Sequence, residues 1–425
     1  MRQVLRTPLP MVLPDFLPRG LTLVSGTTGF LGGHLLRALA TDPPGGGPVV
    51  ALIRAADHHH ARTRQKEAAL RAGVVLPELG LPKDPNARIW TLACKLGEEN
   101  LGLSEELYTL LAQETAVILH AAASVRHGAG FSEMVEDNVT PARQLLHLAT
   151  HRRLKAFHLV STLDVTRLAQ RLGVSGNEEA PLPQRLGETA AQLDGYVASK
   201  WVVERMAELL HRHCQGKLPL LVSRPGLLLW SPSGFAPIKE WFPALLASCL
   251  KLGLLPSANP AVVPSEPITT ETSARGLEPL PVDYVGELCS RLTSALLGSV
   301  EQKGSSFFRL NLVNTNPGTR GLALWPQIFC GLQAAYLAEF PQKDPLRMVS
   351  YRDFLDTCLA QPTPFTPLVP HFADLPALPR MPADTMKAFA QQMPPPPLSW
   401  ELFRPFARFA LQLFAKKTVD LPNPS

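Results

Sequence analysis

The chain has 425 residues, of which 45% are hydrophobic and 18% charged, so a mainly disordered protein is excluded and a folded chain of two or three domains is expected. Lys and Arg number 41 against 36 Asp and Glu, a formal net charge of +5, and because the basic residues are dispersed a nucleic-acid surface is not indicated. The six cysteines are far apart and form no metal-binding pair, which predicts reduced thiols without a structural metal.

The sequence shows no segment that targets or crosses a membrane. Four prolines and Asp15 interrupt the first twenty residues before a secretory apolar region could form, so residues 1–19 are predicted to be an N-terminal extension and not a signal peptide. Continuously apolar stretches such as residues 241–250 are well short of the ~20 residues that span a bilayer. We therefore expect a cytoplasmic protein without a transmembrane segment.

Between residues 20 and 230, strand-like apolar runs alternate with helical patterns, which predicts β-α-β units on a parallel sheet. The first helix is expected at residues 30–40. Strands are expected at residues 21–25, 48–53, 88–93, 116–120, 156–161 and 218–223. Runs that are apolar on both faces are typical of a sheet with helices on each side. The predicted fold class is therefore α/β, a Rossmann-type doubly wound parallel sheet.

The pattern changes in the second half of the chain, where Pro and Gly become frequent and the apolar runs are shorter. Residues 231–360 are predicted to form a smaller C-terminal substrate-binding lobe. Residues 281–315 are expected to return to the Rossmann domain as a helix capped by Asp283, followed by a strand at residues 306–313.

The C-terminal region divides into an arm and a helix. Residues 361–400 contain eleven prolines, which predicts an arm over residues 361–399 without regular structure. Residues 400–425 place apolar side chains at helical spacing among basic ones, which predicts an amphipathic helix and a tail. Packing of this helix on the protein body is the favoured interpretation, and peripheral contact with a membrane is left open.

The run VSGTTGFLGG places Gly26, Gly29 and Gly32 at intervals of three, directly after the first strand and at the start of the first helix. Glycines in this strand–turn–helix context are typical of a dinucleotide-binding fold. Gly26 permits a tight turn and Gly29 the close approach of a pyrophosphate, which backbone N–H groups and the helix N-terminus stabilise. A glycine-rich turn without a ligand is the alternative.

The second strand ends at Arg54, and Arg62, Arg64 and Lys66 follow. An acidic residue is usual here when the cofactor lacks a 2′-phosphate, whereas a guanidinium can bind that phosphate through two charge-assisted hydrogen bonds. The sequence therefore favours NADPH over NADH. A solvated loop position for Arg54 is the alternative interpretation.

Tyr196 and Lys200 are four residues apart in a predicted helix and therefore share one face. A phenol holds its proton tightly, with a reference pKa of ~10, and a neighbouring ammonium lowers that value by ~1–3 units. Lys200 therefore makes Tyr196 a usable proton donor. A third polar group is expected at the end of the strand at residues 156–161, where Ser161 and Thr162 are adjacent. Only one can face the site; we choose Thr162, with Ser161 as the fallback.

These residues together resemble the extended short-chain dehydrogenase/reductase (SDR) superfamily, and more narrowly its thioester reductase branch. That branch includes the terminal reductase domains of nonribosomal peptide synthetases and carboxylic acid reductases, and is related to fatty acyl-CoA reductases. The resemblance runs from about Leu21 to Leu359. It rests on GTTGFLGGHLL, LIRA, NLGLS, HAAASVRH, NVTPARQLLHLA, VST, GYVASKWVVE, SRPG and PVDYVG. The most specific segment is GYVASKWVVE, because Ser199, Trp201 and Glu204 also match the branch.

The resemblance implies NADPH-dependent reduction of an acyl thioester, carried by phosphopantetheine or coenzyme A, to an aldehyde, with the alcohol as a further product left open. It implies a catalytic Thr162, Tyr196 and Lys200, the last two also contacting the cofactor. The remaining implied cofactor contacts are Gly26, Thr28, Gly29, Phe30, Leu31 and Gly32 at the pyrophosphate, Arg54 and Arg64 at the 2′-phosphate, Leu96 at adenine, and Ala121, Ala122, Ala123 and Pro225 elsewhere.

Two positions depart from the pattern of the branch. Where the branch usually has Gly-Asp-Leu, with the acid bound to adenine, this chain has Cys94-Lys95-Leu96. Where the branch usually has Asn after the Val of its H-x-A-A-x-V-N run, Arg126 follows Val125. Neither change removes a catalytic group. Both imply altered specificity or reduced activity.

Three functions are therefore compared. The chain has no adenylation motif and no Asp-Ser carrier attachment motif, so a thioester reductase would receive its acyl donor in trans, from a carrier protein or coenzyme A. A nucleotide-sugar epimerase or hydroxysteroid-type dehydrogenase would use the same Thr-Tyr-Lys chemistry, but the S-K-W-x-x-E continuation argues against it. An NADPH-binding scaffold without catalysis is the third interpretation, motivated by Lys95 and Arg126.

Overall fold

The computed structural model describes residues 16, 19–126, 128–173, 182–183, 194–257, 279–301, 307–315, 325–372, 391–396 and 399–416. The chain divides into two compact units. Unit 1 is formed by the described parts of Met1–Gly226, Val282–Val313 and Met381–Met393, and unit 2 by those of Leu227–Pro281, Asn314–Arg380 and Pro394–Ser425.

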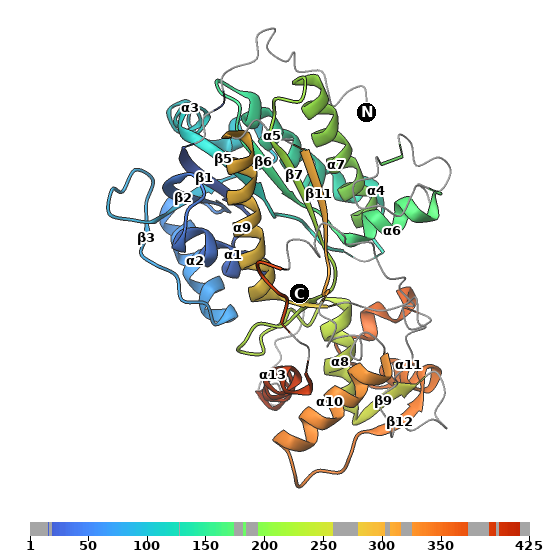
Figure 1. Ribbon diagram of the computed structural model, residues 1–425. Helices are drawn as coiled ribbons and strands as arrows, with labels where there is room; N and C mark the ends of the chain where they lie inside the picture. Colours follow the sequence, from blue (N-terminus) through green and yellow to red (C-terminus); the bar gives the residue numbers. More distant parts are fainter. Residues whose placement is uncertain are drawn as a thin grey trace. The chain divides into compact units, whose positions relative to one another are not determined.

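Unit 1 is built on an eight-stranded sheet in which all paired strands are parallel (Figure 1). The strand order is β11-β7-β6-β5-β1-β2-β4-β3. The strands are β1 Gly20–Ser25, β2 Gly46–Arg54, β3 Leu79–Gly80, β4 Ile89–Cys94, β5 Thr115–His120, β6 Ala156–Val160, β7 Leu220–Pro225 and β11 Phe307–Leu312. The six strands expected in the N-terminal half are all present, and so is the expected late strand, which is β11. The predicted Rossmann-type fold is confirmed.

The order of the sheet reverses between β1 and β5, because β2 and β4 lie on one side of β1 while β5, β6 and β7 lie on the other. In open α/β sheets, ligands bind outside the carboxyl ends of the strands at such a switch point. The loops that follow β1 and β5 therefore lie at the expected ligand site, and the loop that follows β6 is next to them.

Helices cover both faces of this sheet, as predicted. One face carries α3 Glu105–Glu114, α5 Thr140–Thr150 and α7 Gly195–His213, whose apolar side chains share a buried cluster with the strands. The other carries α1 Phe30–Thr41, α2 His58–Ala72 and α9 Val282–Glu301 (Figure 1). The shorter helical elements of unit 1 are η1 Glu99–Gly102, α4 Phe131–Met134, a π-helical turn at Val135–Val139 and α6 Leu163–Arg171.

Helix α9 belongs to unit 1, and Asp283, the expected cap, is not its cap. The helix begins at Val282, so Asp283 lies inside the first turn. Gly286 lets α9 approach α1 closely, because a Cβ there would lie 2.8 Å from the backbone carbon of His34. Thr293 ties α9 to the sheet through a 2.8 Å hydrogen bond between its Oγ1 and Nδ1 of the buried His158.

Unit 2 is smaller and rich in aromatic contacts. Its elements are β8 Leu228–Leu229, α8 Trp241–Leu252, β9 Leu254–Ser257, β10 Leu280–Pro281, α10 Trp325–Glu339, β12 Arg347–Ser350, α11 Tyr351–Ala360, η5 Thr366–His371, η6 Trp400–Leu402 and α13 Phe403–Lys416. Its strands form two parallel pairs, β8 with β10 and β9 with β12. The 3₁₀ helix η5 lies within the segment predicted to lack regular structure, and residues 373–390 of that segment lie outside the described residues.

The predicted C-terminal helix is α13, and its apolar face is used within unit 2. Phe406 is fully buried and stacks on Trp230 with ring centroids 4.6 Å apart, while Phe403 meets the same indole edge-on at 5.0 Å. The helix begins at Phe403, so Pro405 lies in the first turn, where proline is tolerated. In the part of the chain that the structure describes, no helix combines the length and apolar character needed to cross a membrane.

Candidate active site

Helix α7 carries the predicted catalytic pair, and its start is fixed by two local features. Asp194 is the N-cap, with Oδ1 accepting from the backbone N–H of Tyr196 at 2.8 Å and of Val197 at 3.4 Å. Gly195 allows the helix to touch the loop after β5, because a Cβ there would lie only 2.4 Å from the carbonyl oxygen of Ala129. The helix therefore presents Tyr196 at a defined place beside that loop.

Lys200 lies one turn after Tyr196 and is buried, 4% exposed. Its Nζ donates to the carbonyl oxygen of Val160 at 2.9 Å and lies 5.9 Å from the centroid of the Tyr196 ring. Burial lowers the pKa of Lys200 to about 8, and the carboxylate of Glu204 opposes this shift. The structure thus brings the phenol and the ammonium together at the carboxyl end of β6. At neutral pH the ammonium remains mainly charged.

His120, the last residue of β5, is a buried neighbour of this pair. Its Nδ1 lies 2.7 Å from the hydroxyl oxygen of Ser25, the last residue of β1. Burial and the charge of Lys200 lower the pKa of His120 to about 3, so the imidazole is neutral in the physiological range. It therefore adds no second cation beside Lys200.

Ser161 and Thr162 occupy different environments, which bears on the choice between them. The Ser161 hydroxyl donates to the buried carboxylate of Glu204. Thr162 is the N-cap of α6, where its hydroxyl accepts from the backbone N–H of Asp164 at 3.3 Å and donates to Asp164 Oδ2 at 3.4 Å, both long contacts. Because the Ser161 hydroxyl is bound to Glu204, the geometry favours Thr162 as the substrate-facing hydroxyl, which stays a prediction.

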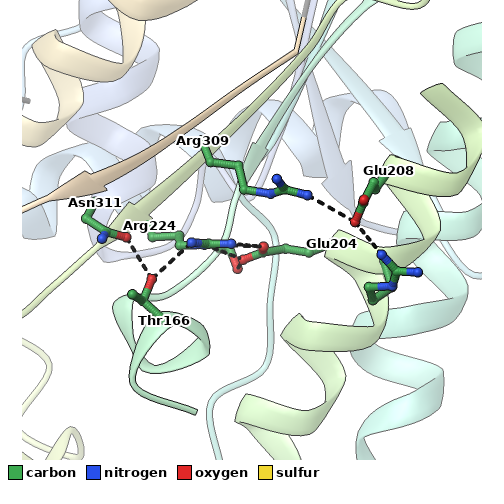
Figure 2. A network of polar contacts seen from close by, with 8 residues as sticks. Thr166, Glu204, Glu208, Arg224, Arg309 and Asn311 are labelled. Carbon is green, nitrogen blue, oxygen red and sulfur yellow. Dashed lines mark hydrogen bonds and ion pairs between the residues drawn. The ribbon is translucent and has the colours of Figure 1, made fainter. Parts of the chain in front are cut away.

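A buried ionic network joins α7 to strands β7 and β11 (Figure 2). Glu204 pairs with Arg224, the closest contact being 2.7 Å from Nη2 to Oε2, and both side chains are at most 2% exposed. Arg224 also donates from Nη1 to Thr166 Oγ1 at 3.0 Å. One turn further along α7, Glu208 pairs with Arg309 at 3.0 Å. Sequence reasoning noted Glu204 only as a motif position and assigned it no role.

In the glycine turn, backbone atoms lie close to Gly26 and Gly32. Gly26 has φ +84°, and a Cβ there would lie 2.6 Å from the backbone nitrogen of Ala122. A Cβ on Gly32 would lie 2.0 Å from the carbonyl oxygen of Gly26. Gly29 is the N-cap of α1 and has no side chain to cap it, and the first turn contains no acidic residue. An anion at this helix N-terminus would therefore meet backbone donors and no negative charge.

Two buried polar atoms beside the glycine turn lack a hydrogen-bond partner among the described residues. They are Oγ1 of Thr27 and Oε1 of Gln65. Gln65 reaches the turn from α2, where its Nε2 donates to the carbonyl oxygen of Thr27 at 3.2 Å. Buried polar atoms usually have partners, so these atoms fit a site that binds a polar ligand. Sequence reasoning named Thr28 and missed Thr27; the signal available was only the pair of adjacent threonines.

Arg54 and Arg64 are brought together at the carboxyl end of β2. Arg54 is exposed, and Arg64 reaches back from α2 so that its Nη1 donates to the Arg54 carbonyl oxygen. The intervening Asp57 caps α2 through the N–H of His60 at 2.8 Å. Arg64 of α2 thus lies against the backbone at the end of β2, beside Arg54.

The remaining predicted cofactor contacts follow the ends of other strands. Ala121 and Ala122 continue from β5, and their backbone N–H groups donate to the carbonyl and hydroxyl oxygens of Ser25 at 3.3 and 3.4 Å. Ala123 is exposed. Leu96 is half-buried after β4, two residues beyond the register partner of Arg54. Pro225 is the buried last residue of β7.

Lys95 and Arg126, the two residues that depart from the branch pattern, each form an ion pair with an acidic side chain. Lys95 is exposed and forms a 2.9 Å ion pair with Glu98. Arg126 is half-exposed, donating from Nη2 to the Glu133 carbonyl oxygen at 2.7 Å and to Asp137 Oδ2 at 3.1 Å. Their charges are therefore partly offset by these acidic neighbours.

Asn138 is a site residue that sequence reasoning missed. It is buried in the π-helical turn and binds both backbone groups of Ser124, accepting at 2.7 Å and donating at 3.0 Å. Its Nδ2 also donates to Ser199 Oγ at 2.9 Å, and that hydroxyl donates to the Tyr196 carbonyl oxygen at 2.7 Å. Asn138 thus links the loop after β5 to α7. The sequence analysis quoted Asn138 only as the first residue of the segment NVTPARQLLHLA and assigned it no role.

Comparison with known proteins agrees with this geometry. A family model described as male sterility protein, an NAD-binding family, matches residues 24–289, well over half of the chain. The chain belongs to this family. This membership agrees with the nucleotide-binding fold that the sequence predicts for residues 20–230.

Two curated relatives show how far the similarity extends. The nonribosomal peptide synthetase asaC of Aspergillus flavus is 33% identical over 259 residues, covering 59% of this chain and 24% of that protein. The L-2-aminoadipate reductase large subunit of Eremothecium gossypii is 28% identical over 326 residues, covering 71% of this chain and 21% of that protein. The chain thus spans less than a quarter of the length of these relatives.

A solved structure shows the same fold over nearly the whole chain. The reductase domain of a nonribosomal peptide synthetase from Mycobacterium tuberculosis aligns with a TM-score of 0.71 at 22% identity, covering 95% of this chain and 94% of that one. The fold of both units therefore has a counterpart in that reductase domain.

Proposed function

We propose that this chain is an NADPH-dependent reductase that converts the acyl group of a thioester to an aldehyde. The observation that carries the proposal is the pairing of Tyr196 with the buried ammonium of Lys200 at the carboxyl end of β6. Membership of the NAD-binding family, the resemblance of the sequence to the thioester reductase branch, and the printed names of the similar proteins, which include reductases, support it.

In the proposed reaction, bound NADPH supplies the hydride that reaches the thioester carbon. Tyr196 donates its proton to the oxygen of that carbon, and Thr162 hydrogen-bonds the same oxygen. The charge of Lys200 favours release of the phenol proton. The resulting hemithioacetal then loses its C–S bond, so that the sulfur leaves as a thiol and the aldehyde forms. Positioned acid catalysis of this kind contributes ~10²–10⁴-fold to the rate.

NADPH is proposed over NADH because Arg54 and Arg64 meet at the end of β2. A 2′-phosphate placed there would accept charge-assisted hydrogen bonds from two guanidinium groups. Asp57, the nearest acidic residue in sequence, accepts from the backbone of α2, and this hydrogen bond lowers its pKa. Its carboxylate is therefore used as a helix cap.

The acyl donor is proposed to be a carrier protein, with coenzyme A as the simpler substitute. Two of the similar proteins are named as a nonribosomal peptide synthetase or as a domain of one. The phosphopantetheine arm is common to both donors, so both present the same thioester chemistry to Tyr196.

The test is to follow the loss of NADPH absorbance with short, medium and long acyl-CoA thioesters and with acyl-loaded carrier protein. We expect turnover with at least one thioester, an aldehyde as product, and a loss of ~10²–10⁴-fold in Tyr196→Phe with NADPH binding retained. Consumption of two NADPH per thioester would identify the alcohol as the end product.

Two outcomes would contradict the proposal. Activity on UDP-sugars or hydroxysteroids, without turnover of any thioester, would assign the chain to the alternative SDR chemistry. NADPH binding without turnover of any of these substrates would instead indicate a scaffold.

A further inference from the structure

We propose that the Glu204–Arg224 ion pair is a positioning pair for the active site. It holds Thr162 in place through the hydroxyls of Ser161 and Thr166, and it keeps the Glu204 carboxylate one helical turn from Lys200. This inference rests on the proposed function and adds to it residues that act through the catalytic side chains.

The first link joins α7 to the end of β6. Two consecutive residues at the end of that strand are bound by α7. Lys200 donates to the Val160 carbonyl oxygen at 2.9 Å, and Glu204 accepts from the Ser161 hydroxyl. The backbone N–H of Ser161 also donates to the Ser223 carbonyl oxygen at 2.7 Å. The backbone immediately before Thr162 is therefore fixed to both α7 and β7.

The second link fixes the chain after Thr162. Thr162 is the N-cap of α6, and Thr166 lies one turn into that helix. The Thr166 hydroxyl accepts from Arg224 Nη1 at 3.0 Å and donates to Asn311 Oδ1 at 2.8 Å, as Figure 2 shows. The two charged partners thus hold one hydroxyl on each side of Thr162. A change in Glu204 or Arg224 would therefore shift Thr162, which is the N-cap of α6.

The pair also determines the electrostatic surroundings of Lys200. Among the described residues, Glu204 and Tyr196 on α7 and the neutral His120 on β5 lie near its ammonium, and Arg224 on β7 pairs with Glu204. Burial lowers the pKa of Lys200 to about 8, while Glu204 raises it. Without the Glu204 carboxylate, burial would act unopposed and the ammonium would lose its proton at a lower pH.

Glu208 provides a matched control on the same helix. It lies one turn beyond Glu204, is equally buried, and pairs with Arg205, Arg212 and Arg309. Its loss would leave buried guanidinium groups without their carboxylate, as the loss of Glu204 does, and would cost stability in the same way. Glu204 is the carboxylate that raises the pKa of Lys200, and Glu208 lies one turn further from that ammonium.

The experiment titrates Lys200 directly by NMR of protein labelled with ¹³C-ε-lysine, with the resonance assigned through Lys200→Met. We expect the midpoint of Lys200 to fall by ~1 pH unit in Glu204→Gln, to return toward the wild-type value in Glu204→Asp, and to stay unchanged in Glu208→Gln. An equal shift in Glu204→Gln and Glu208→Gln, or no shift in either, would overturn the electrostatic part.

The second measurement is the pH profile of kcat/KM with NADPH and a thioester. The alkaline limb should move with the Lys200 midpoint, because kcat/KM reports groups of the free enzyme. Ser161→Ala and Thr166→Val keep both charges, so they should leave the pH profile in place while lowering kcat by ~10-fold, with KM little changed. Wild-type kcat in both variants would overturn the positional part, even if Glu204→Gln fails to fold.

The two proposals can fail separately. If the wild-type protein reduces no thioester, the proposed function is wrong, and the Lys200 titration still decides whether Glu204 acts on the ammonium. If the protein is active and the variants behave like Glu208→Gln, only the positioning role is wrong.

Discussion

At the scale of single residues, the glycine turn depends on two positions that have no side chain. Gly26 and Gly32 leave no room for a Cβ, since the nearest backbone atoms would be 2.6 and 2.0 Å away. The buried Thr27 hydroxyl beside them has no partner among the described residues. These features fit a ligand that approaches the backbone of the turn closely, with the Thr27 hydroxyl beside it.

Gly32 and its neighbour Gly33 form a matched pair for testing this turn. A Cβ on Gly33 would make only ordinary contacts, the closest at 3.8 Å to Val74. Gly32→Ala should lower NADPH affinity by ~10-fold or more, because the turn must open to relieve the clash with Gly26, whereas Gly33→Ala should stabilise α1 by ~0.4–1 kcal/mol. Binding titration and thermal unfolding measure both. Equal NADPH affinity in the two variants would show that the turn does not hold the cofactor.

Arg64 tests the choice of cofactor at the same scale. Removing a guanidinium that binds the 2′-phosphate loses a charged hydrogen bond of ~1.5–3 kcal/mol, so Arg64→Ala should weaken NADPH binding by ~10-fold or more and leave NADH binding unchanged. Arg71→Ala, in the last turn of the same helix, is the control and should alter neither. A parallel loss of NADPH and NADH affinity in Arg64→Ala would rule out the phosphate contact.

At the scale of elements, the strands and first helix could be predicted because their signals are local. Runs apolar on both faces gave the positions of β1, β2 and β5, and the glycine spacing gave the start of α1. The π-helical turn with Asn138 could not be predicted, because its hydrogen bonds reach Ser124 and Ser199, which are distant in sequence. The ionic network could not be predicted for the same reason: β7, β11 and α7 meet only in the folded sheet.

For the C-terminal helix too, the sequence pattern predicts the local structure but not the residue that it contacts. Its amphipathic pattern predicted a buried face, while the identity of the partner, Trp230, required the structure. Phe406→Ala should destabilise the protein by ~3–5 kcal/mol, because it removes a fully buried ring. Gln412→Ala, at an exposed position on α13, should change stability by less than ~0.5 kcal/mol. Urea unfolding followed by tryptophan fluorescence measures both; a wild-type midpoint for Phe406→Ala would show that α13 is not docked as described.

At the scale of the whole molecule, the sheet that carries the site is not made from one continuous segment. Its edge strand β11 and the covering helix α9 come after residues that belong to unit 2. The ionic network uses that late strand, since Arg309 and Asn311 both lie on β11. The Rossmann unit therefore needs the chain beyond residue 226, and a fragment ending there would lack partners of Glu208 and Thr166.

The central claim is that Tyr196, Lys200 and Thr162 direct a hydride from NADPH to the carbon of an acyl thioester. The most direct measurement incubates the protein with acyl thioester and NADPH deuterated at either face of C4, followed by mass spectrometry of the aldehyde. We predict one deuterium on the carbonyl carbon with one of the two labelled forms, and a rate of labelled-aldehyde formation ~10²–10⁴-fold lower in Tyr196→Phe. Aldehyde that carries no deuterium with either form, or the absence of aldehyde with every thioester, would contradict the account.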